Sequence, residues 1–347
     1  KYTLPVTFRA AGTSLSGQSI SDSILIVAGK NWEKYSISED FERITLQPGI
    51  IGARVNEILK PHGRKFAPDP ASVKSAMVGG IVMNNASGMN CGTHANSDKE
   101  LLSAKIVLAD GTRLNTGDPE SRMTFEKNHT PFLNKIIEIR DEIRNDNELS
   151  DRIRKKYSIK NVTGLNLLPF VIYDDPFDII AHLMVGSEGT LAFLSEVTMK
   201  TEHDYPYSAS AMLYFSNIKD ACRAVVAMKP GPVFSAELLD KKSLASVNDT
   251  TGTGLTAVLT ESRYSRRATS QYRRNKKDTF SIRNRYSYSL YGQTRRIFEI
   301  LGYPFGYFPI GRRNSQAGYD RFDRRRSVSI ERATRSDRRF TRVIGNE

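Results

Sequence analysis

The sequence predicts an α+β fold. Short runs rich in β-branched and aromatic residues, such as Val6–Arg9 and Ile24–Val27, predict strands around a glycine-rich turn. Apolar residues at helical spacing predict helices between later strands. The two kinds of element do not alternate as in a regular βαβ repeat, which favours mixed layers over a parallel sheet. The length of 347 residues allows about two domains.

Turn residues and helix caps place the later elements of this fold along the chain. Pro48–Gly49 predicts a turn before a helix with Val55, Ile58 and Leu59 on one face, and Asp110–Gly111 predicts a hairpin. Three further helices and one strand follow. The first helix bears Phe132, Leu133, Ile136, Ile137 and Ile143, and the second runs from Asp175-Pro176 to Gly186. A strand from Gly189 to Lys200 comes next, and then a helix capped by Asn217 that bears Ile218, Ala221, Cys222, Val225 and Met228.

The net charge of +13 comes entirely from one end of the chain. Residues 264–347 carry 21 basic and 7 acidic residues, which leaves 30 basic and 31 acidic residues in 1–263. After Arg263 leucine almost vanishes, and arginine, serine and tyrosine dominate without a periodic stripe. We expect 264–347 to form no packed core and few long-range contacts, because it buries too little apolar surface to offset chain entropy.

Cysteines and histidines give no sign of a metal site or of a disulfide framework. Cys91 and Cys222 fit no metal spacing and are expected to be unpaired, reduced thiols of a cytosolic protein. The five histidines form no ligand pair, so no metal is expected. No apolar run reaches the ~20 residues of a membrane span, and the first residues do not resemble a signal peptide.

Three segments of small residues predict one binding site for a phosphate-bearing ligand. The first, RAAGTSLSGQ (residues 9–18), follows a strand, and its glycines let backbone N–H groups approach a diphosphate closely. By itself it reads equally well as an ordinary serine- and glycine-rich loop. The second comprises PDPAS (68–72) and VGGIVMNNASGMNCGT (78–93), and the third is VGSEGTLAFLSEVTMK (185–200). The second is too apolar for a solvated loop, and three such segments favour one extended ligand over three coincidences.

These segments resemble, in order and spacing, the flavin-dependent D-lactate dehydrogenase and glycolate oxidase family of the vanillyl-alcohol-oxidase superfamily. The resemblance covers about residues 2–263 and is closest to long members that continue into an iron–sulfur region. It implies that 1–203 is an FAD-binding domain of the PCMH type. It also implies that 204–263 begins the FAD-linked oxidase C-terminal cap domain, on the segments AELLDKKSLASV (236–247) and LTESR (259–263).

The resemblance also implies which residues hold FAD. The first segment would wrap the pyrophosphate, the second would line the flavin and its ribityl chain, and the third would close over flavin and adenosine. The residues concerned are Arg9, Ala10, Gly12, Thr13, Ser14, Leu15, Ser16, Gly17, Gln18, Pro68, Asp69, Ser72, Gly79, Gly80, Asn84, Ser87, Gly88, Gly92, Gly186, Ser187, Glu188, Gly189, Thr190 and Leu191. Some relatives attach the flavin to a histidine where Thr13 stands, so FAD is expected to be non-covalent. We further expect the strands of 5–203 to join one sheet system and the three segments to converge on one groove.

Two parts of the family pattern are missing from this sequence. A small α/β subdomain that precedes Pro5 in the family is absent. So is the histidine-rich, glycine-flanked segment that supplies the catalytic base, and the catalytic residues are therefore unknown. We expect this chain by itself to be inactive.

We infer that the residues after about Arg263 are translated out of frame. When codons are chosen for FEILGYPFGYFPI (298–310) and read one nucleotide later, they can give Ser-Lys-Tyr-Trp-Asp-Ile-Arg-Ser-Gly-Ile-Phe-Pro. That string resembles the stretch that follows in the same family. The codons of residues 311–334, read in the same shifted frame, can also give a family-like sequence. The alternative is a basic tail that binds nucleic acid through interleaved arginine and tyrosine. It accounts only for the charge, so we expect no nucleic-acid partner.

The resemblance implies an oxidoreductase that oxidises a small 2-hydroxy acid, D-lactate first, by hydride transfer to N5 of FAD. Glycolate and D-2-hydroxyglutarate are the alternative substrates. An iron–sulfur centre, a quinone or a cytochrome would accept the electrons. The expected location is the cytoplasm, or the inner face of a membrane as a peripheral protein.

Overall fold

The computed structural model describes residues 4–14, 16–88, 91, 94–159, 161, 164–215, 217–228, 233–243, 256–264 and 310–314. The chain divides into two compact units, Lys1–Asp204 and Tyr205–Glu347, and each is described by itself. The division falls one residue after the boundary predicted at residue 203.

The first unit is built on a five-stranded antiparallel sheet. Its order is β3 (Tyr35–Ile37), β4 (Arg43–Leu46), β8 (Phe193–Lys200), β6 (Leu101–Val107) and β7 (Arg113–Asn115). The predicted Asp110–Gly111 turn joins β6 to β7, with Gly111 at φ +90°. Alternate residues, among them Ile44, Leu46, Ile106, Val197 and Met199, are buried in the main core. The strand periodicity of two therefore gives this sheet one core face.

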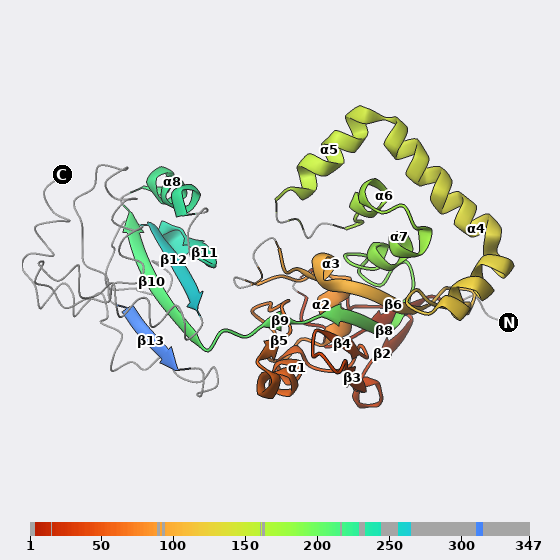
Figure 1. Cartoon of the computed structure of the whole chain (residues 1–347), viewed down its shortest axis with the longest axis horizontal. Helices are drawn as coiled ribbons and strands as arrows, with labels where there is room; N and C mark the ends of the chain where they lie inside the picture. Colours follow the sequence, from red (N-terminus) through yellow and green to blue (C-terminus); the bar gives the residue numbers. More distant parts are fainter. Residues whose placement is uncertain are drawn as a thin grey trace, which may run out of the picture. The chain divides into compact units, whose positions relative to one another are not determined.

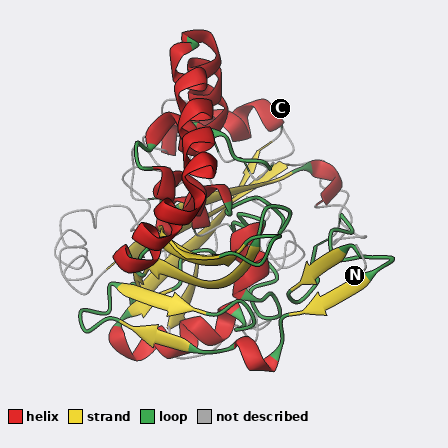
Figure 2. Cartoon of the chain, turned by 90° about the vertical axis from the view of Figure 1, so that its right-hand side faces the viewer, coloured by secondary structure: helices red, strands yellow, loops and turns green. Residues whose placement is uncertain are grey.

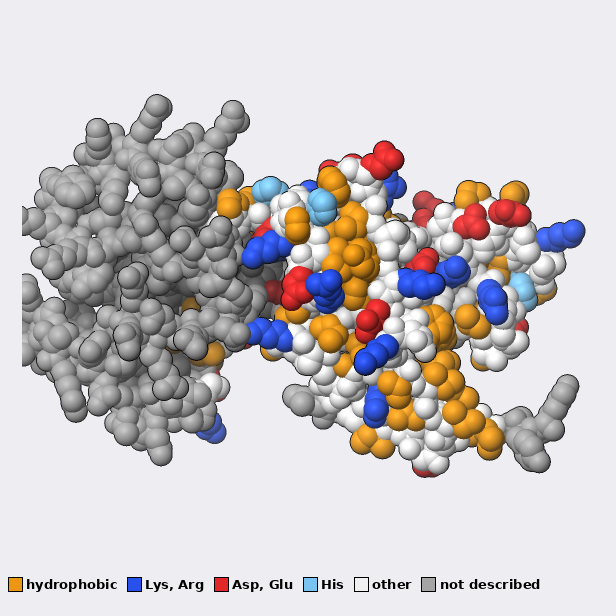
Figure 3. Space-filling model, turned by 90° about the horizontal axis from the view of Figure 1, so that it is seen from below, with side chains coloured by type: hydrophobic (Ala, Val, Ile, Leu, Met, Phe, Trp, Pro, Cys, Tyr) orange, Lys and Arg blue, Asp and Glu red, His pale blue; other side chains and the backbone are white. Residues whose placement is uncertain are grey.

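Two small sheets stand apart from this one. β1 (Val6–Arg9) pairs in parallel with β2 (Ile24–Val27), and β5 (Arg64–Lys65) pairs with β9 (Glu202–His203). The prediction of one sheet system for 5–203 is therefore wrong. Periodicity identifies which segments are strands, but it does not say which strands pair across the chain. Val6, Ile24, Ile26 and Val27 are 43–47% exposed, and hydrophobic side chains also gather on the face of this unit that Figure 3 shows.

The helices of the first unit cover the sheet and form a long arch. The α-helices are α1 (Gly52–Leu59), α2 (Val78–Met83), α3 (Ser97–Glu100), α4 (Pro119–Asn145), α5 (Asn147–Tyr157), α6 (Leu168–Ile172) and α7 (Pro176–Leu183), with 3-10 turns at Lys30–Trp32 and Lys60–His62. In Figure 1, α4 and α5 meet at an angle and α6 and α7 lie beneath them, and Figure 2 shows the same arch from the side. Asp118, Asp146 and Asp175 cap α4, α5 and α7 with their carboxylates.

Two helix predictions need correction in detail. The predicted apolar stripe of α4 buries Leu133, Ile136 and Ile143, whereas Phe132 is 41% exposed. α7 begins at Pro176, as predicted, but it ends at Leu183 instead of Gly186. Met184, the C-cap, still has helical dihedrals, and the chain turns away at Gly186, which adopts φ +83°, in the left-handed region.

The second unit contains a four-stranded antiparallel sheet and one helix. The strand order is β11 (Ser235–Leu239), β12 (Thr256–Tyr264), β10 (Tyr207–Phe215) and β13 (Ile310–Asn314). The predicted helix, α8 (Ile218–Met228), is capped by Asn217, whose side-chain oxygen accepts from the Asp220 N–H at 3.0 Å. Its buried face contacts this unit's own core, formed by Leu213, Phe215, Ala221, Ala224, Met228 and Val258.

β13 lies within the basic segment and pairs with β10 residue by residue from Tyr207 to Ala211. The expectation of few long-range contacts in 264–347 is therefore wrong for Ile310–Asn314. Backbone hydrogen bonds form this pairing, and composition does not forecast them. Residues 265–309 and 315–347 lie outside the described residues.

Neither cysteine forms a disulfide among the described residues: Cys91 is buried and Cys222 is exposed. In the part of the chain that the structure describes, no helix has the length and apolarity that crossing a membrane requires.

Candidate functional site

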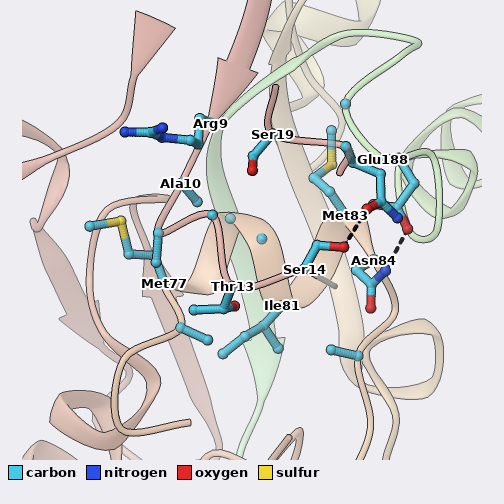
Figure 4. A pocket seen from close by; sticks show the side chains of 18 of the residues that line it. Arg9, Ala10, Thr13, Ser14, Ser19, Met77, Ile81, Met83, Asn84 and Glu188 are labelled. Atoms are coloured by element: carbon cyan, nitrogen blue, oxygen red, sulfur yellow. Dashed lines mark hydrogen bonds between the residues drawn. The ribbon is translucent and has the colours of Figure 1, made fainter. Parts of the chain in front are cut away.

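The three predicted segments converge on one cavity of about 650 Å³ in the first unit (Figure 4). This volume lies in the usual range for small-molecule and cofactor sites. The cavity is lined by Phe8, Arg9, Ala10, Ala11, Gly12, Thr13, Ser14, Ser16, Gln18, Ser19, Ala28, Pro48, Pro70, Ser72, Ala76, Met77, Gly79, Gly80, Ile81, Met83, Asn84, Ala86, Ser87, Glu188, Gly189, Ala192, Phe193 and Leu194. The predicted convergence on a single groove is confirmed.

The first segment enters the cavity directly from the end of β1. The Arg9 carbonyl accepts from the Ala28 N–H at 2.8 Å and so fixes the start of the loop. Gly12 follows at φ +69°, and a Cβ there would lie 3.1 Å from Cδ of Arg9. The backbone angle favours glycine, and any Cβ there would also make the Arg9 side chain move by a few tenths of an ångström. The turn brings the hydroxyl-bearing residues Thr13, Ser14, Ser16 and Ser19 to the cavity wall.

The second segment forms a wall through close backbone packing at the start of α2. A Cβ on Gly79 would lie 2.6 Å from Cβ of Pro48, so no side chain fits there. The Gly79 N–H donates to the Pro48 carbonyl at 2.9 Å. On the other side of the wall, a Cβ on Gly80 would lie 3.4 Å from Cβ of Ala10. The Gly79-Gly80 pair thus lets α2 approach both the Pro48 turn and the first segment.

The third segment is hydrogen-bonded to the end of α2 through Glu188. The Glu188 N–H donates to the Met83 carbonyl at 2.9 Å, and the Asn84 amide donates to the Glu188 carboxylate at 2.5 Å. Glu188 adopts φ +54°, which is uncommon for a residue with a side chain. Burial raises the pKa of the Glu188 carboxyl, while the hydrogen bond from Asn84 lowers it.

Two buried polar atoms of the cavity lining have no hydrogen-bond partner among the described residues. They are Nε of Arg9 and the Ser87 hydroxyl oxygen. A buried polar atom without a partner costs about 1–3 kcal/mol, so native proteins normally supply one. A guanidinium nitrogen and a hydroxyl, beside further hydroxyls and closely approaching backbone, suit an oxygen-rich anionic ligand. The residues present therefore fit a diphosphate-bearing cofactor.

Fourteen of the residues predicted to bind the cofactor line this cavity: Arg9, Ala10, Gly12, Thr13, Ser14, Ser16, Gln18, Ser72, Gly79, Gly80, Asn84, Ser87, Glu188 and Gly189. Leu15 and Gly92 lie outside the described residues. The cavity lining does not include Gly17, Pro68, Asp69, Gly88, Gly186, Ser187, Thr190 and Leu191.

Three of these eight residues make close contacts within the protein. A Cβ on Gly88 would lie 1.8 Å from the Asp69 carbonyl oxygen, so these two backbones pack against each other. Ser187 is 1% exposed and donates its hydroxyl to the Met184 carbonyl. Whether either group of residues contacts FAD stays a prediction.

The list of predicted contact residues missed the apolar part of the cavity. Phe8, Pro48, Met77, Ile81, Met83 and Phe193 all line it, and of these Ile81, Met83 and Phe193 lie within the predicted segments. The rings of Phe8 and Phe193 lie 4.6 Å apart, and Trp32 meets Phe193 edge-on at 5.1 Å. The apolar character of the second segment and the place of Phe193 in the third were the available signals.

Comparison with known proteins gives the same ligand class. Residues 1–117 match the family model described as FAD binding domain. Over 69% of its length the chain is 26% identical to D-2-hydroxyglutarate dehydrogenase of Haemophilus influenzae, covering 24% of that protein. It is 25% identical to glycolate oxidase subunit GlcD of Escherichia coli K12, over 71% of this chain and 40% of that protein. It is 24% identical to D-lactate dehydrogenase of Archaeoglobus fulgidus, over 70% and 43% respectively. The chain thus spans less than half the length of these relatives.

Proposed function

We propose that this chain, whose residues 1–117 belong to the FAD binding domain family, is the flavin-binding part of a dehydrogenase for small 2-hydroxy acids. One observation carries the proposal: three small-residue segments, far apart in the sequence, line one cavity beside the buried Arg9 Nε, which has no hydrogen-bond partner among the described residues. A diphosphate is the part of FAD that such donors recognise. All 24 site residues named from the sequence remain proposed contacts of FAD. Those that line the cavity would contact it directly.

The protein's contribution is binding and orientation. When bound, FAD supplies the acceptor for the α-hydrogen that leaves the substrate as hydride. In this proposal the hydroxyls of Thr13, Ser14 and Ser16 and the Arg9 guanidinium would hold phosphate oxygens. The apolar residues Phe8 and Phe193 would form one apolar wall beside the cofactor. In the described residues no histidine or cysteine lines the cavity, which supports non-covalent binding.

We propose D-lactate as the first substrate to test, with glycolate and D-2-hydroxyglutarate as alternatives. Relatives named for each of these three acids match at 24–26% identity. Substrate contacts would come from the cap domain, of which residues 204–263 form only the start in this proposal. No catalytic base is assigned, and the chain by itself is expected to show no turnover of any of the three acids.

A second candidate function, nucleic-acid binding, rests only on the net charge of residues 264–347. We favour a shift of reading frame after about Arg263, because it accounts for both the change in composition and the family-like residues in the shifted frame. Sequencing the coding DNA across codons 258–270 decides between them. A frame that reads on without a shift would leave the basic segment as genuine protein and remove the reason for rejecting nucleic acid.

The electron acceptor proposed for the whole protein is an iron–sulfur centre, quinone or cytochrome. We propose a location in the cytoplasm or at the inner face of a membrane.

Trp32 provides a direct test of cofactor binding. It is the single tryptophan of the chain, and its ring contacts Phe193 of the cavity wall. FAD should quench Trp32 emission saturably at one equivalent, and removal of FAD by dialysis in denaturant should leave no flavin attached. Emission that does not change at any FAD concentration would refute the cavity as the flavin site.

A further inference from the structure

The cavity of the first unit carries two opposite charges in its wall. Among the described residues that line it, Arg9 is the only basic side chain and Glu188 is the only acidic one. Figure 4 shows these two side chains on opposite sides of the cavity. The guanidinium attracts an anionic ligand, whereas an ionised carboxyl group repels it. A carboxylate at Glu188 therefore opposes the ligand that the rest of the lining suits.

Hydrogen bonds hold the Glu188 carboxyl group in this wall. The Glu188 N–H donates to the Met83 carbonyl at 2.9 Å, and the backbone there adopts φ +54°, followed by φ +75° at Gly189. The Asn84 amide donates to Oε1 of Glu188 at 2.5 Å. Among the described residues, Oε2 has no such bond. The residue is thus held through its backbone and through one carboxyl oxygen, and Oε2 is left to meet a ligand.

The neighbours of Glu188 supply no charge that would compensate a carboxylate. Its contacts on α2, Met83 and Asn84, are not ionisable. In the third segment the nearest charged residue along the chain is Glu196, which does not line the cavity, and the first segment contributes Arg9 alone. Burial raises the pKa of the Glu188 carboxyl, and the hydrogen bond from Asn84 offsets only part of that rise. Glu188 therefore takes up a proton more readily than an exposed glutamate does.

We propose that Glu188 takes up one proton when a diphosphate-bearing cofactor enters the cavity. The inference rests on the proposed function and concerns how that same site accepts an anion. The proton comes from solvent and goes to Oε2, so the neutral acid donates Oε2–H to an oxygen of the cofactor while Oε1 keeps its bond from Asn84. Proton uptake removes the negative charge from the described lining, so protonation and cofactor binding stabilise each other.

The direction of the pH effect follows from this coupling. Phosphates in the cavity disfavour the carboxylate, so the pKa of Glu188 is higher in the complex than in the ligand-free protein. Between these two pKa values, binding of FAD is accompanied by binding of a proton. The Kd for FAD should therefore increase by up to about tenfold per pH unit as the pH rises through this window, and it should be constant on either side.

Titration of Trp32 emission with FAD between about pH 5 and about pH 9 measures this dependence. Glu188→Gln keeps the shape of the side chain and cannot ionise. It should bind FAD with one Kd over the whole range, and more tightly than the wild-type protein at the alkaline end. The matched control is Glu196→Gln, in the same segment but outside the lining, which should keep the wild-type slope. Both variants retain Glu100, whose pKa of about 7 affects them equally.

Calorimetry provides a second readout that needs no variant. The heat of FAD binding, compared in buffers that differ in ionisation enthalpy, counts the protons taken up by the complex. Inside the pH window we expect up to about one proton for each FAD bound by the wild-type protein, because a single carboxyl group titrates. Glu196→Gln should take up the same number and Glu188→Gln none. Unchanged Trp32 emission before FAD is added verifies that both variants are folded.

Three outcomes would overturn the proposal. A Kd that is independent of pH in the wild-type protein, or an equal slope in Glu188→Gln, would remove the proton-linked role and leave the flavin site in place. Weaker binding by Glu188→Gln at alkaline pH would show that Glu188 contacts the cofactor as a carboxylate. Trp32 emission that FAD does not quench at any pH would refute the proposed function, and this inference with it.

Discussion

Glu100 offers a sharp test of the electrostatics of the first unit. It is the last residue of α3 and is 4% exposed. Burial, and then the neighbouring carboxylate of Glu202, raise the pKa of the Glu100 carboxyl from 4.5 to about 7, with Lys200 acting in the opposite direction and Asp98 adding a smaller rise. Between these two pH values the folded protein holds a proton that the unfolded chain has lost.

The direction of the pH effect follows from that difference. Because the folded state binds more protons between pH 4.5 and about 7, the free energy of unfolding falls as pH rises through this window and then levels off. A shift of this size corresponds to about 3 kcal/mol at 1.36 kcal/mol per pKa unit. Glu100→Gln keeps the shape and removes the charge. It should match the wild-type protein near pH 4.5 and exceed its stability above pH 7 by up to about 3 kcal/mol.

Urea unfolding followed by Trp32 emission measures this directly, since the chain's one tryptophan lies in the first unit. Glu138→Gln is the matched control: its carboxylate forms a surface pair with Lys135 and is 63% exposed, so its effect should stay within about 0.5 kcal/mol at every pH. If Glu100→Gln changed stability equally at pH 4.5 and pH 8, or destabilised the protein at pH 8, the assignment of a protonated Glu100 would be refuted.

Other predictions concern the cavity, the basic segment and activity. Gly12→Val should abolish FAD quenching of Trp32, because φ +69° and the 3.1 Å approach to Arg9 leave no room for a branched side chain; stoichiometric flavin in this variant would contradict the site. Gly186→Val should also lose FAD, through its backbone angle of φ +83° and not by filling the cavity, and circular dichroism should show whether the fold survives. Trypsin should cleave between residues 265 and 309 well before it cuts the first unit, as judged by mass spectrometry; equal resistance would show that this basic segment is as well protected as the flavin domain. With an artificial electron acceptor, the chain should turn over D-lactate and glycolate no faster than a heated sample; turnover that heating removes would show that a catalytic base is present.

The sequence by itself determined the kinds of element and the chemistry of the ligand. Gly12 and Gly79 indicated special backbone positions, since Gly12 adopts φ +69° and a Cβ on Gly79 would lie 2.6 Å from Cβ of Pro48. The Asp175-Pro176 start of α7 and the Asn217 cap of α8 were likewise local signals, decided within a few residues.

Only the tertiary structure decided what long-range packing controls. β1 and β2 pair apart from the main sheet, and β13 pairs with β10, because strand partners are chosen by the whole fold and not by periodicity. Phe8 and Phe193, which are 185 positions apart in the sequence, have ring centroids 4.6 Å apart and supply an apolar wall, and their pairing is not visible in either segment by itself. Gly88 and Ser187, which read as ligand contacts, lie outside that lining because neighbouring backbone already occupies their surroundings.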